Sequence, residues 1–203
     1  FDGNSSTYNG GAIYIAPDAQ GFHVEYCTFV NNSTANGNGA ALQTNQPGTV
    51  INSTFYGNTA PADGGTLGIG EYVFVDVYNS ILWNDNIEYE FGGYVGNFNV
   101  VHTDIEDWES YYSGYPGFNN NNNIDADPLF TDANNGDYTL QEGSPCIDAG
   151  TADLNGDGID DITDYNDLAP DMGAYEFQNI IAGPTGFQYF LQSASVMLWW
   201  NPS

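Results

Sequence analysis

The sequence predicts an all-β protein: a right-handed parallel β-helix (solenoid) whose last coils are closed by an irregular C-terminal cap. Several landmarks recur every 26 to 28 residues. A period of that length without a helical half suits coils of short strands rather than leucine-rich or tetratricopeptide repeats. Gly and Asn are abundant and no long amphipathic helix pattern is present, which favours short strands joined by tight turns. The hydrophobic share of 41% and the aromatic share of 15% supply a sizeable core despite a net charge of −27.

Each repeat contains an apolar residue followed by an asparagine. The apolar positions are Phe1, Phe29, Phe55 and Leu82, and the asparagines are Asn4, Asn32, Asn58 and Asn84. In coils stacked about 4.8 Å apart, equivalent residues lie above one another. We therefore expect an inward apolar stack and an asparagine ladder at a corner, where Asn tolerates left-handed backbone angles. Cys27, Ser53 and Ser80 should form a smaller stack, and Gly pairs should mark the next corner.

These landmarks divide the chain into three parts. Residues 1–109 form the coils, with strand-rich runs at 24–29, 49–55 and 72–82 and a looser rung at 97–105. Residues 110–178 form a loop-rich cap, and residues 179–203 change register again and read as a linker followed by new strands.

The charge balance restricts the partners. The chain has no Lys and no Arg beside 27 Asp and Glu, so nothing would contact phosphates and nucleic-acid binding is excluded. Anionic lipids and acidic polysaccharides are disfavoured unless a metal bridges the charges, and divalent cations are the predicted partners. No apolar run is long enough for membrane insertion of this segment. Cys27 and Cys146 could pair or remain free, and their spacing does not decide between the two.

Residues 153–164 fit a twelve-residue calcium loop position by position. Oxygen donors fall at positions 1, 3 and 5, Gly158 at the sharp turn, a backbone carbonyl at position 7, and carboxylates at positions 9 and 12. The predicted ligands are Asp153, Asn155, Asp157, Ile159, Asp161 and Asp164. Because flanking helices are not evident, we expect an isolated loop holding a structural Ca²⁺. The competing interpretation is a solvated acidic turn.

A catalytic site is the less favoured interpretation of the remaining acids. Glycoside hydrolysis requires two carboxylates about 5 Å or about 6.5–9.5 Å apart. His102, Asp104 and Glu106 alternate and could share one face of a strand, which makes Asp104 and Glu106 the alternative catalytic pair. The preferred interpretation is that both are solvated strand positions and that the chain has no catalytic residue.

An aromatic-rich loop follows this strand. Its members are Trp108, Tyr111, Tyr112 and Tyr115, with Phe118 nearby. These rings could stack on neutral sugars, or they could cover the flank of the solenoid. The sequence leaves both interpretations open.

The C-terminal half carries a family resemblance. The order NSILWN…TDIE…NIDADPLF…NGDYTLQEGSPCIDAG…DMGAYE resembles the end of bacterial secreted right-handed β-helix proteins with polymorphic-outer-membrane-protein-like or choice-of-anchor repeats. That resemblance implies a pectate-lyase-like solenoid. Pectate-lyase-type catalysis abstracts a proton with Arg or Lys, and this chain has neither. After Phe177, GPTGF and SVMLWWNP resemble the opening of a fibronectin type III domain.

Together these features predict a secreted or cell-surface structural or adhesive segment, non-catalytic, as in an extracellular fibre or adhesin. The alternatives are a carbohydrate-binding module or a polysaccharide-degrading glycoside hydrolase acting on neutral glycans. Besides divalent cations, neutral glycans or other copies of the chain in a surface assembly are the expected partners.

Overall fold

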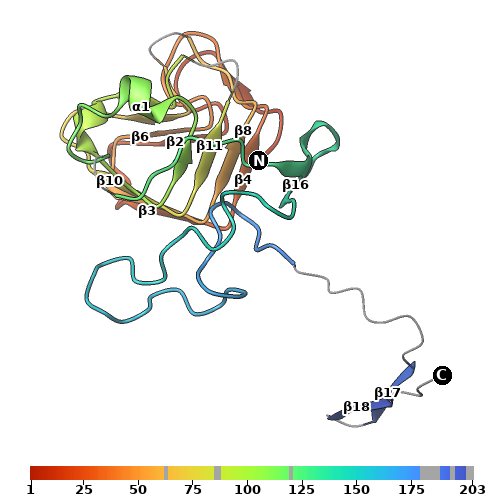
Figure 1. The fold of residues 1–203 in the computed structure, drawn as a ribbon. Coiled ribbons are helices and arrows are strands. Elements are labelled where there is room, and N and C mark those ends of the chain that lie inside the picture. The colour runs from red at the N-terminus through yellow and green to blue at the C-terminus, as the bar shows by residue number, and fades with distance from the viewer. Residues whose placement is uncertain (62–63, 85–87, 119–120, 179–187, 193–194, 200–203) are drawn as a thin grey trace.

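The computed structural model describes residues 1–61, 64–84, 88–118, 121–178, 188–192 and 195–199. Its body is a parallel β-solenoid of about four turns with little helix (Figure 1). The predicted all-β parallel architecture is therefore confirmed.

Three parallel sheets run along the solenoid, and each takes one strand from every coil. The β2 sheet contains β2 (Ile13–Ile15), β6 (Leu42–Thr44), β9 (Leu67–Ile69) and β12 (Phe91–Gly93). The β3 sheet contains β3 (Phe22–Glu25), β7 (Gly48–Ile51), β10 (Val75–Tyr78) and β13 (Phe98–Val101). The β4 sheet contains β4 (Thr28–Val30), β8 (Thr54–Tyr56), β11 (Ile81–Trp83) and β14 (Asp104–Ile105). A further parallel pair joins β1 (Ser5–Ser6) and β5 (Ser33–Thr34).

The apolar stack lies on the inner face of the β4 sheet. Phe29 pairs with Phe55, Phe55 with Leu82, and Leu82 with Ile105, and all four side chains are fully buried. The ring of Phe1 stacks on Phe29 with centroids 4.7 Å apart, and Phe29 stacks on Phe55 at 4.8 Å. The distance between the rings equals the spacing of hydrogen-bonded strands, so the rings stay in contact from one coil to the next. Burying each large side chain contributes about 1.5–3 kcal/mol.

A second ladder fixes the coil length. The N–H of Cys27 donates to Ser53 Oγ, that of Ser53 to Ser80 Oγ, and that of Ser80 to Thr103 Oγ1, across 26, 27 and 23 residues. The predicted period therefore holds for the first coils, and the last coil is shorter. Most of the difference lies in the connection from β11 to β12, which has fewer residues than the one from β8 to β9.

The prediction of left-handed backbone angles at the ladder asparagines is wrong. The left-handed residues are the preceding Gly3, Asn31 and Gly57, with φ of 65°, 54° and 64°. The left-handed turn thus falls one residue before the asparagine. As a result, the backbone N–H and the side-chain amide of each ladder asparagine both point to the next coil. The Gly corner is present as expected, and a Cβ on Gly39 (φ 69°) would lie 2.3 Å from the carbonyl oxygen of Leu42, which only glycine avoids.

A further left-handed corner follows the β3 sheet. It comprises Tyr26, Asn52, Asn79 and His102, with φ between 42° and 48°. The sequence did not predict this corner, because none of the four positions is glycine and their sequence contexts differ. The corner turns the chain sharply from the β3 sheet into the β4 sheet.

The cap begins with α1 (Trp108–Tyr111), which spans the predicted boundary after residue 109. Tyr112 and Phe118 then close the end of the core, with ring centroids 5.0 Å apart and planes within 15°. The asparagine run accepts hydrogen bonds from the open edge of the last coil. The N–H of His102 donates to the carbonyl of Asn121, and that of Thr103 to Asn123 Oδ1. Covering this edge removes the unpaired strand groups that would otherwise bind another chain.

A hairpin and a strap complete the cap. The antiparallel strands β15 (Phe130–Asp132) and β16 (Asp137–Leu140), joined through the 3₁₀ turn η2 (Ala133–Asn135), pack on the outer face of the β4 sheet. Residues 144–177, here called the strap, then run back along the corner after the β3 sheet. Asn79 exchanges hydrogen bonds with Thr151, and the N–H of Ala174 donates to Thr54 Oγ1. Another 3₁₀ turn, η1 (Val95–Asn97), precedes β13.

The C-terminal strands β17 (Gln188–Gln192) and β18 (Ser195–Trp199) form an antiparallel pair. Residues 179–187 and 200–203, which carry most of the predicted fibronectin-type pattern, lie outside the described residues, so that assignment stays a prediction. Within the described ranges, no helix has the length and apolar character needed to cross a membrane.

Candidate functional site

The asparagine ladder ends at two carboxyl groups. Each asparagine below Asn84 donates its backbone and side-chain N–H to the Oδ1 of the next, at 2.7–3.1 Å. Asn84 donates its backbone N–H to Glu106 Oε2 at 2.9 Å, and its side-chain amide to both oxygens of Glu90 at 3.1 and 2.9 Å. Glu106, half of the alternative catalytic pair, is thus an acceptor that terminates the ladder.

Glu90 is buried at this end, with 3% of its surface exposed. Burial raises its pKa to about 8, although the hydrogen bonds from Asn84 act in the opposite direction. The charge of Glu106 raises the pKa of Glu90 further. At neutral pH the Glu90 side chain is therefore largely a neutral acid.

Asp104 lies fully buried beneath the cap, so its interpretation as a solvated strand position is wrong. Its Oδ1 accepts the N–H of Ala126, and its Oδ2 accepts the thiol of Cys146, both at 3.2 Å. Burial raises the pKa of Asp104 to about 7 and also raises the pKa of the Cys146 thiol. Cys27 and Cys146 are both free thiols, so the Cys146 side chain serves as a hydrogen-bond donor rather than in a disulfide.

The expectation that His102, Asp104 and Glu106 share one face of a strand is wrong. The left-handed backbone of His102 (φ 48°) interrupts the alternation, and β14 begins only at Asp104. His102 Nδ1 donates to the carbonyl of Ala149 at 2.7 Å, and Nε2 accepts the amide of Asn122 at 2.9 Å. The imidazole therefore fixes the strap and the asparagine run, and Asp104 has no access to a substrate.

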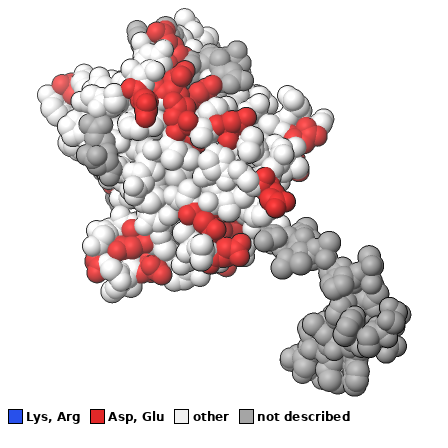
Figure 2. Space-filling view, in the orientation of Figure 1, with Lys and Arg blue, Asp and Glu red and all other residues white. Residues whose placement is uncertain are grey.

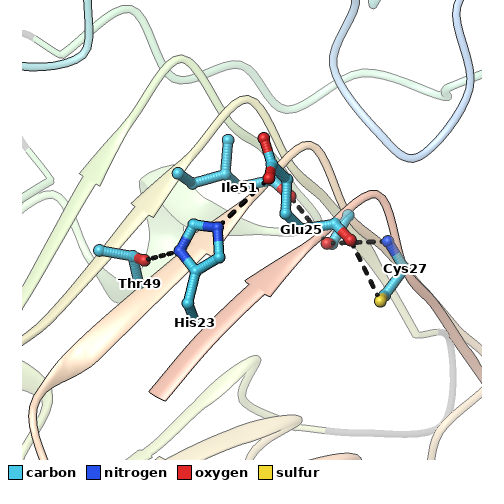
Figure 3. Close-up of polar contacts among 6 residues, drawn as sticks. His23, Glu25, Cys27, Thr49 and Ile51 are labelled. Carbon is cyan, nitrogen blue, oxygen red and sulfur yellow. Dashed lines mark hydrogen bonds and ion pairs between the residues drawn. The ribbon is translucent and has the colours of Figure 1, made fainter. Parts of the chain in front are cut away.

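The second histidine lies on the outer face of the β3 sheet. Figure 3 shows His23 between Thr49 and Glu25, with Nδ1 2.6 Å from Thr49 Oγ1 and Nε2 3.3 Å from Glu25 Oε2. The His23 side chain is 56% exposed, so this pair contributes little to stability. We interpret the hydrogen bond between His23 and Thr49 as a surface contact between coils.

The aromatic loop divides between the core and the surface. Tyr112 is 2% exposed, and its hydroxyl accepts the N–H of Phe91 at 3.0 Å; it is a core residue, so its predicted role as a sugar platform is wrong. Trp108 packs against the same core. Tyr111 and Tyr115 remain 41% and 40% exposed. The loop therefore covers the core through Tyr112 and Trp108, and sugar stacking stays a prediction for the exposed Tyr111 and Tyr115.

Tyr111 and Tyr115 line a groove of about 460 Å³. Its floor includes Gly92 and Gly93, and Tyr89 contacts Tyr111 edge-to-face with centroids 4.9 Å apart. We call this the tyrosine groove. The glycine backbone and the tyrosine rings together give this groove an open surface with both polar and apolar groups.

The predicted calcium loop is a tight acidic turn held by its own backbone. Asp153 accepts three backbone N–H groups at 2.7, 3.2 and 2.7 Å, and these bonds, that of Gly158 first, lower its pKa. Asn155 Oδ1 accepts the N–H of Asp157, and Asp157 Oδ1 that of Ile159, both at 2.9 Å.

The six predicted ligands are not gathered into one group. Asp161 accepts the N–H of Leu154 at 2.9 Å and so reaches the loop. Asp164 instead lines a separate hollow together with Tyr26 and Glu176. Across the part of the chain that the structure describes, no three His, Cys, Asp or Glu side chains are placed to hold a metal ion together.

A second hollow, not anticipated from the sequence, lies between the β4 sheet and the cap hairpin. It has a volume of about 460 Å³. The solenoid supplies Tyr56 and Trp83, which are register partners on the outer face of β8 and β11. The cap supplies Asp127 and Asp132, with Gln141 at the edge. We call it the hairpin hollow. The signal in the sequence was the aromatic residue after Phe55 and after Leu82, one step out of the inward stack.

Figure 2 shows acidic side chains distributed over the visible face with no basic side chain among them, as the composition requires. Comparison with protein-family models, with curated proteins and with solved structures found no match for this chain. The site must therefore be interpreted from its own chemistry.

Proposed function

We propose that this chain is a non-catalytic structural or adhesive segment of a secreted or cell-surface protein, as in an extracellular fibre or adhesin. The observation that carries the proposal is the position of Asp104, which is fully buried and bonded to Ala126 and Cys146. Its supposed partner Glu106 ends the asparagine ladder. Both acids serve as hydrogen-bond acceptors within the scaffold. The resemblance of the C-terminal half to bacterial secreted β-helix surface proteins supports the same role.

We propose further that residues 179–203 begin a fibronectin type III-like domain. An antiparallel pair such as β17 and β18 suits the first strands of a sandwich. Tandem modules of this kind are typical of exported proteins.

A structural Ca²⁺ at residues 153–164 belongs to the proposal. The oxygen donors of Asp153, Asn155, Asp157 and Asp161 are the kind that this hard cation takes, and all four belong to one hydrogen-bonded loop. Asp164 lies apart, so the described residues fit the ion in part. The chain would hold the ion through the first four side chains, and the ion would offset their mutual repulsion.

The tyrosine groove favours a second candidate function, which is binding of neutral glycans. Exposed Tyr111 and Tyr115 rings can stack on sugar faces, and the glycine floor allows a chain to lie close to the backbone. Such binding would make the segment adhesive without catalysis.

The test is a panel of neutral and acidic polysaccharides with Ca²⁺ present, measuring both reducing-end release and retention. We expect no release, retention of neutral glycans, and loss of that retention in Tyr111→Ala/Tyr115→Ala. Tyr72→Ala, which removes a tyrosine 83% exposed outside the groove, is the control. Release that disappears in Asp104→Asn/Glu106→Gln would make the chain a hydrolase and overturn the proposal.

A further inference from the structure

The hairpin hollow joins aromatic rings to carboxylates in one concave place. Tyr56 and Trp83 stand on rigid strands of the β4 sheet, and Phe130 packs edge-on against Tyr56 with centroids 5.7 Å apart. In the cap, Asp132 is the last residue of β15, and Asp127 lies in the segment that leads into this strand. A pocket with apolar walls and a few converging polar groups is the usual form of a binding site.

The carboxylates are held in place by local bonds. Asp127 Oδ1 accepts the N–H of Leu129 at 2.9 Å, and Asp132 Oδ2 accepts the side-chain amide of Asn135 at 2.7 Å. Each bond engages one oxygen, whereas a carboxylate offers about four acceptor sites. Leu129 is left-handed (φ 53°), which is rare for a bulky residue and directs the chain sharply between the two acids.

From this arrangement we propose that the hairpin hollow binds an organic cation, namely the lysine or arginine side chain of a partner protein. An ammonium or guanidinium group is attracted to the faces of Trp and Tyr rings. It also makes charge-assisted hydrogen bonds to carboxylates, which are about twice as strong as neutral ones. The hollow offers both groups to a single ligand.

The charge of the whole molecule favours the same occupant. The chain has no Lys or Arg of its own, so no internal basic side chain competes for Asp127 and Asp132. A field from 27 acids raises the local concentration of cations and repels anions. A neutral sugar would gain nothing from that field, and this decides between the two ligands for the hairpin hollow. The inference does not rest on the glycan proposal, which concerns the tyrosine groove.

The experiment uses the full chain and two probes that differ only in charge: N-acetyl-arginine amide and N-acetyl-citrulline amide. Binding is followed by the indole N–H signal of Trp83 in ¹⁵N NMR spectra, assigned through Trp83→Phe, since the chain has 4 Trp. We expect saturable shifts with the arginine probe and about tenfold weaker binding with citrulline. Raising the salt from about 10 mM to about 0.15 M shortens the screening length from about 30 Å to about 8 Å and should weaken arginine binding.

Two charge-matched variants locate the effect. Asp127→Asn/Asp132→Asn should weaken arginine binding about tenfold, whereas Asp18→Asn/Glu71→Gln, which removes two exposed acids outside the hollow, should leave it unchanged. All four positions are exposed, and unchanged amide spectra would show that each variant is folded. Equal binding of arginine and citrulline, equal loss in both variants, or larger Trp83 shifts with a neutral glycan than with arginine would each overturn the proposal. A loss of glycan retention in the tyrosine-groove variant would not bear on it.

Discussion

Carboxyl groups in the described residues find their hydrogen-bond donors in the backbone and in uncharged side chains such as the Asn84 amide, because the chain has no Lys or Arg. Asp171 accepts the N–H groups of Asp148 and Phe177, and Glu176 those of Asn166 and Asp171. Backbone donors satisfy acceptors without supplying charge. Where burial is deepest, the acid is therefore pushed toward its neutral form, which explains the raised pKa of Glu90.

Replacing Glu90 by Gln should stabilise the protein at pH 8 and have little effect at pH 5. The pKa of Glu90 is about 8 in the folded protein against an ordinary 4.5. Between these values the folded state keeps a proton that the unfolded state has lost, so stability falls as pH rises, by up to about 1.4 kcal/mol per pH unit. Urea unfolding at pH 5, 6.5 and 8 measures the slope.

Glu88→Gln is the matched control, since Glu88 is exposed and two positions away. The control should keep the decline of stability between pH 5 and pH 8. An unchanged decline in Glu90→Gln would show that Glu90 is not the titrating group. Asp104, with a pKa raised to about 7, would then be the next group to replace by Asn.

Among the elements, the asparagine ladder is the device that joins one coil to the next at its corner. Asn58 stands in its middle, fully buried, where its Oδ1 accepts two N–H groups of Asn32 and its amide reaches Phe29 O and Asn84 Oδ1. Removing this side chain leaves the buried N–H of Asn32 without its acceptor and takes a donor each from Phe29 O and Asn84 Oδ1. Asn4, in contrast, is exposed at the end of the ladder.

Asn58→Ala should therefore lower the free energy of unfolding by at least about 2 kcal/mol, because each unsatisfied buried group costs about 1–3 kcal/mol. Asn4→Ala should cost about 1 kcal/mol or less. Chemical denaturation of both variants measures the difference. Equal losses would mean that the ladder contributes through packing alone.

The loop at residues 153–164 gives a prediction for ligand binding. If it holds Ca²⁺, adding about 1 mM CaCl₂ should raise the melting temperature, and EDTA should reverse the rise. Asp153→Asn/Asp157→Asn should abolish the effect, because both carboxylates are offered as ligands. The control Asp18→Asn/Glu71→Gln removes the same charge elsewhere. A rise that persists in the loop variant would reflect general screening.

On the scale of the whole molecule, net charge opposes folding. All 27 acids repel one another. Within the described residues, the ion pair between His23 and Glu25 is exposed to solvent and offsets little of this repulsion. Raising NaCl from about 10 mM to about 0.15 M at pH 8 should therefore raise the melting temperature, since the screening length falls to about 8 Å. The rise should be much smaller near pH 4, where many carboxyls are protonated. Circular dichroism melts at both pH values provide the measurement.

The sequence by itself determined the repeating part of this protein. Phe29, Phe55 and Leu82 recur at the spacing of one coil, and stacked coils must place equal positions above one another. The inner stack, the asparagine ladder and the Ser ladder follow from that one rule. Local chemistry likewise predicted a tight acidic loop at residues 153–164, and whether it holds Ca²⁺ stays a prediction.

The tertiary structure alone decided the sites, because they depend on contacts between segments that do not repeat. Asp104 is buried by Cys146, 42 residues away, and Thr54 receives the N–H of Ala174 across 120 residues. No local pattern records where the cap folds back. Tyr112 is therefore a core residue, while Tyr111 beside it is exposed. Trp83 and Asp127 line the same hollow, although they lie far apart in the sequence.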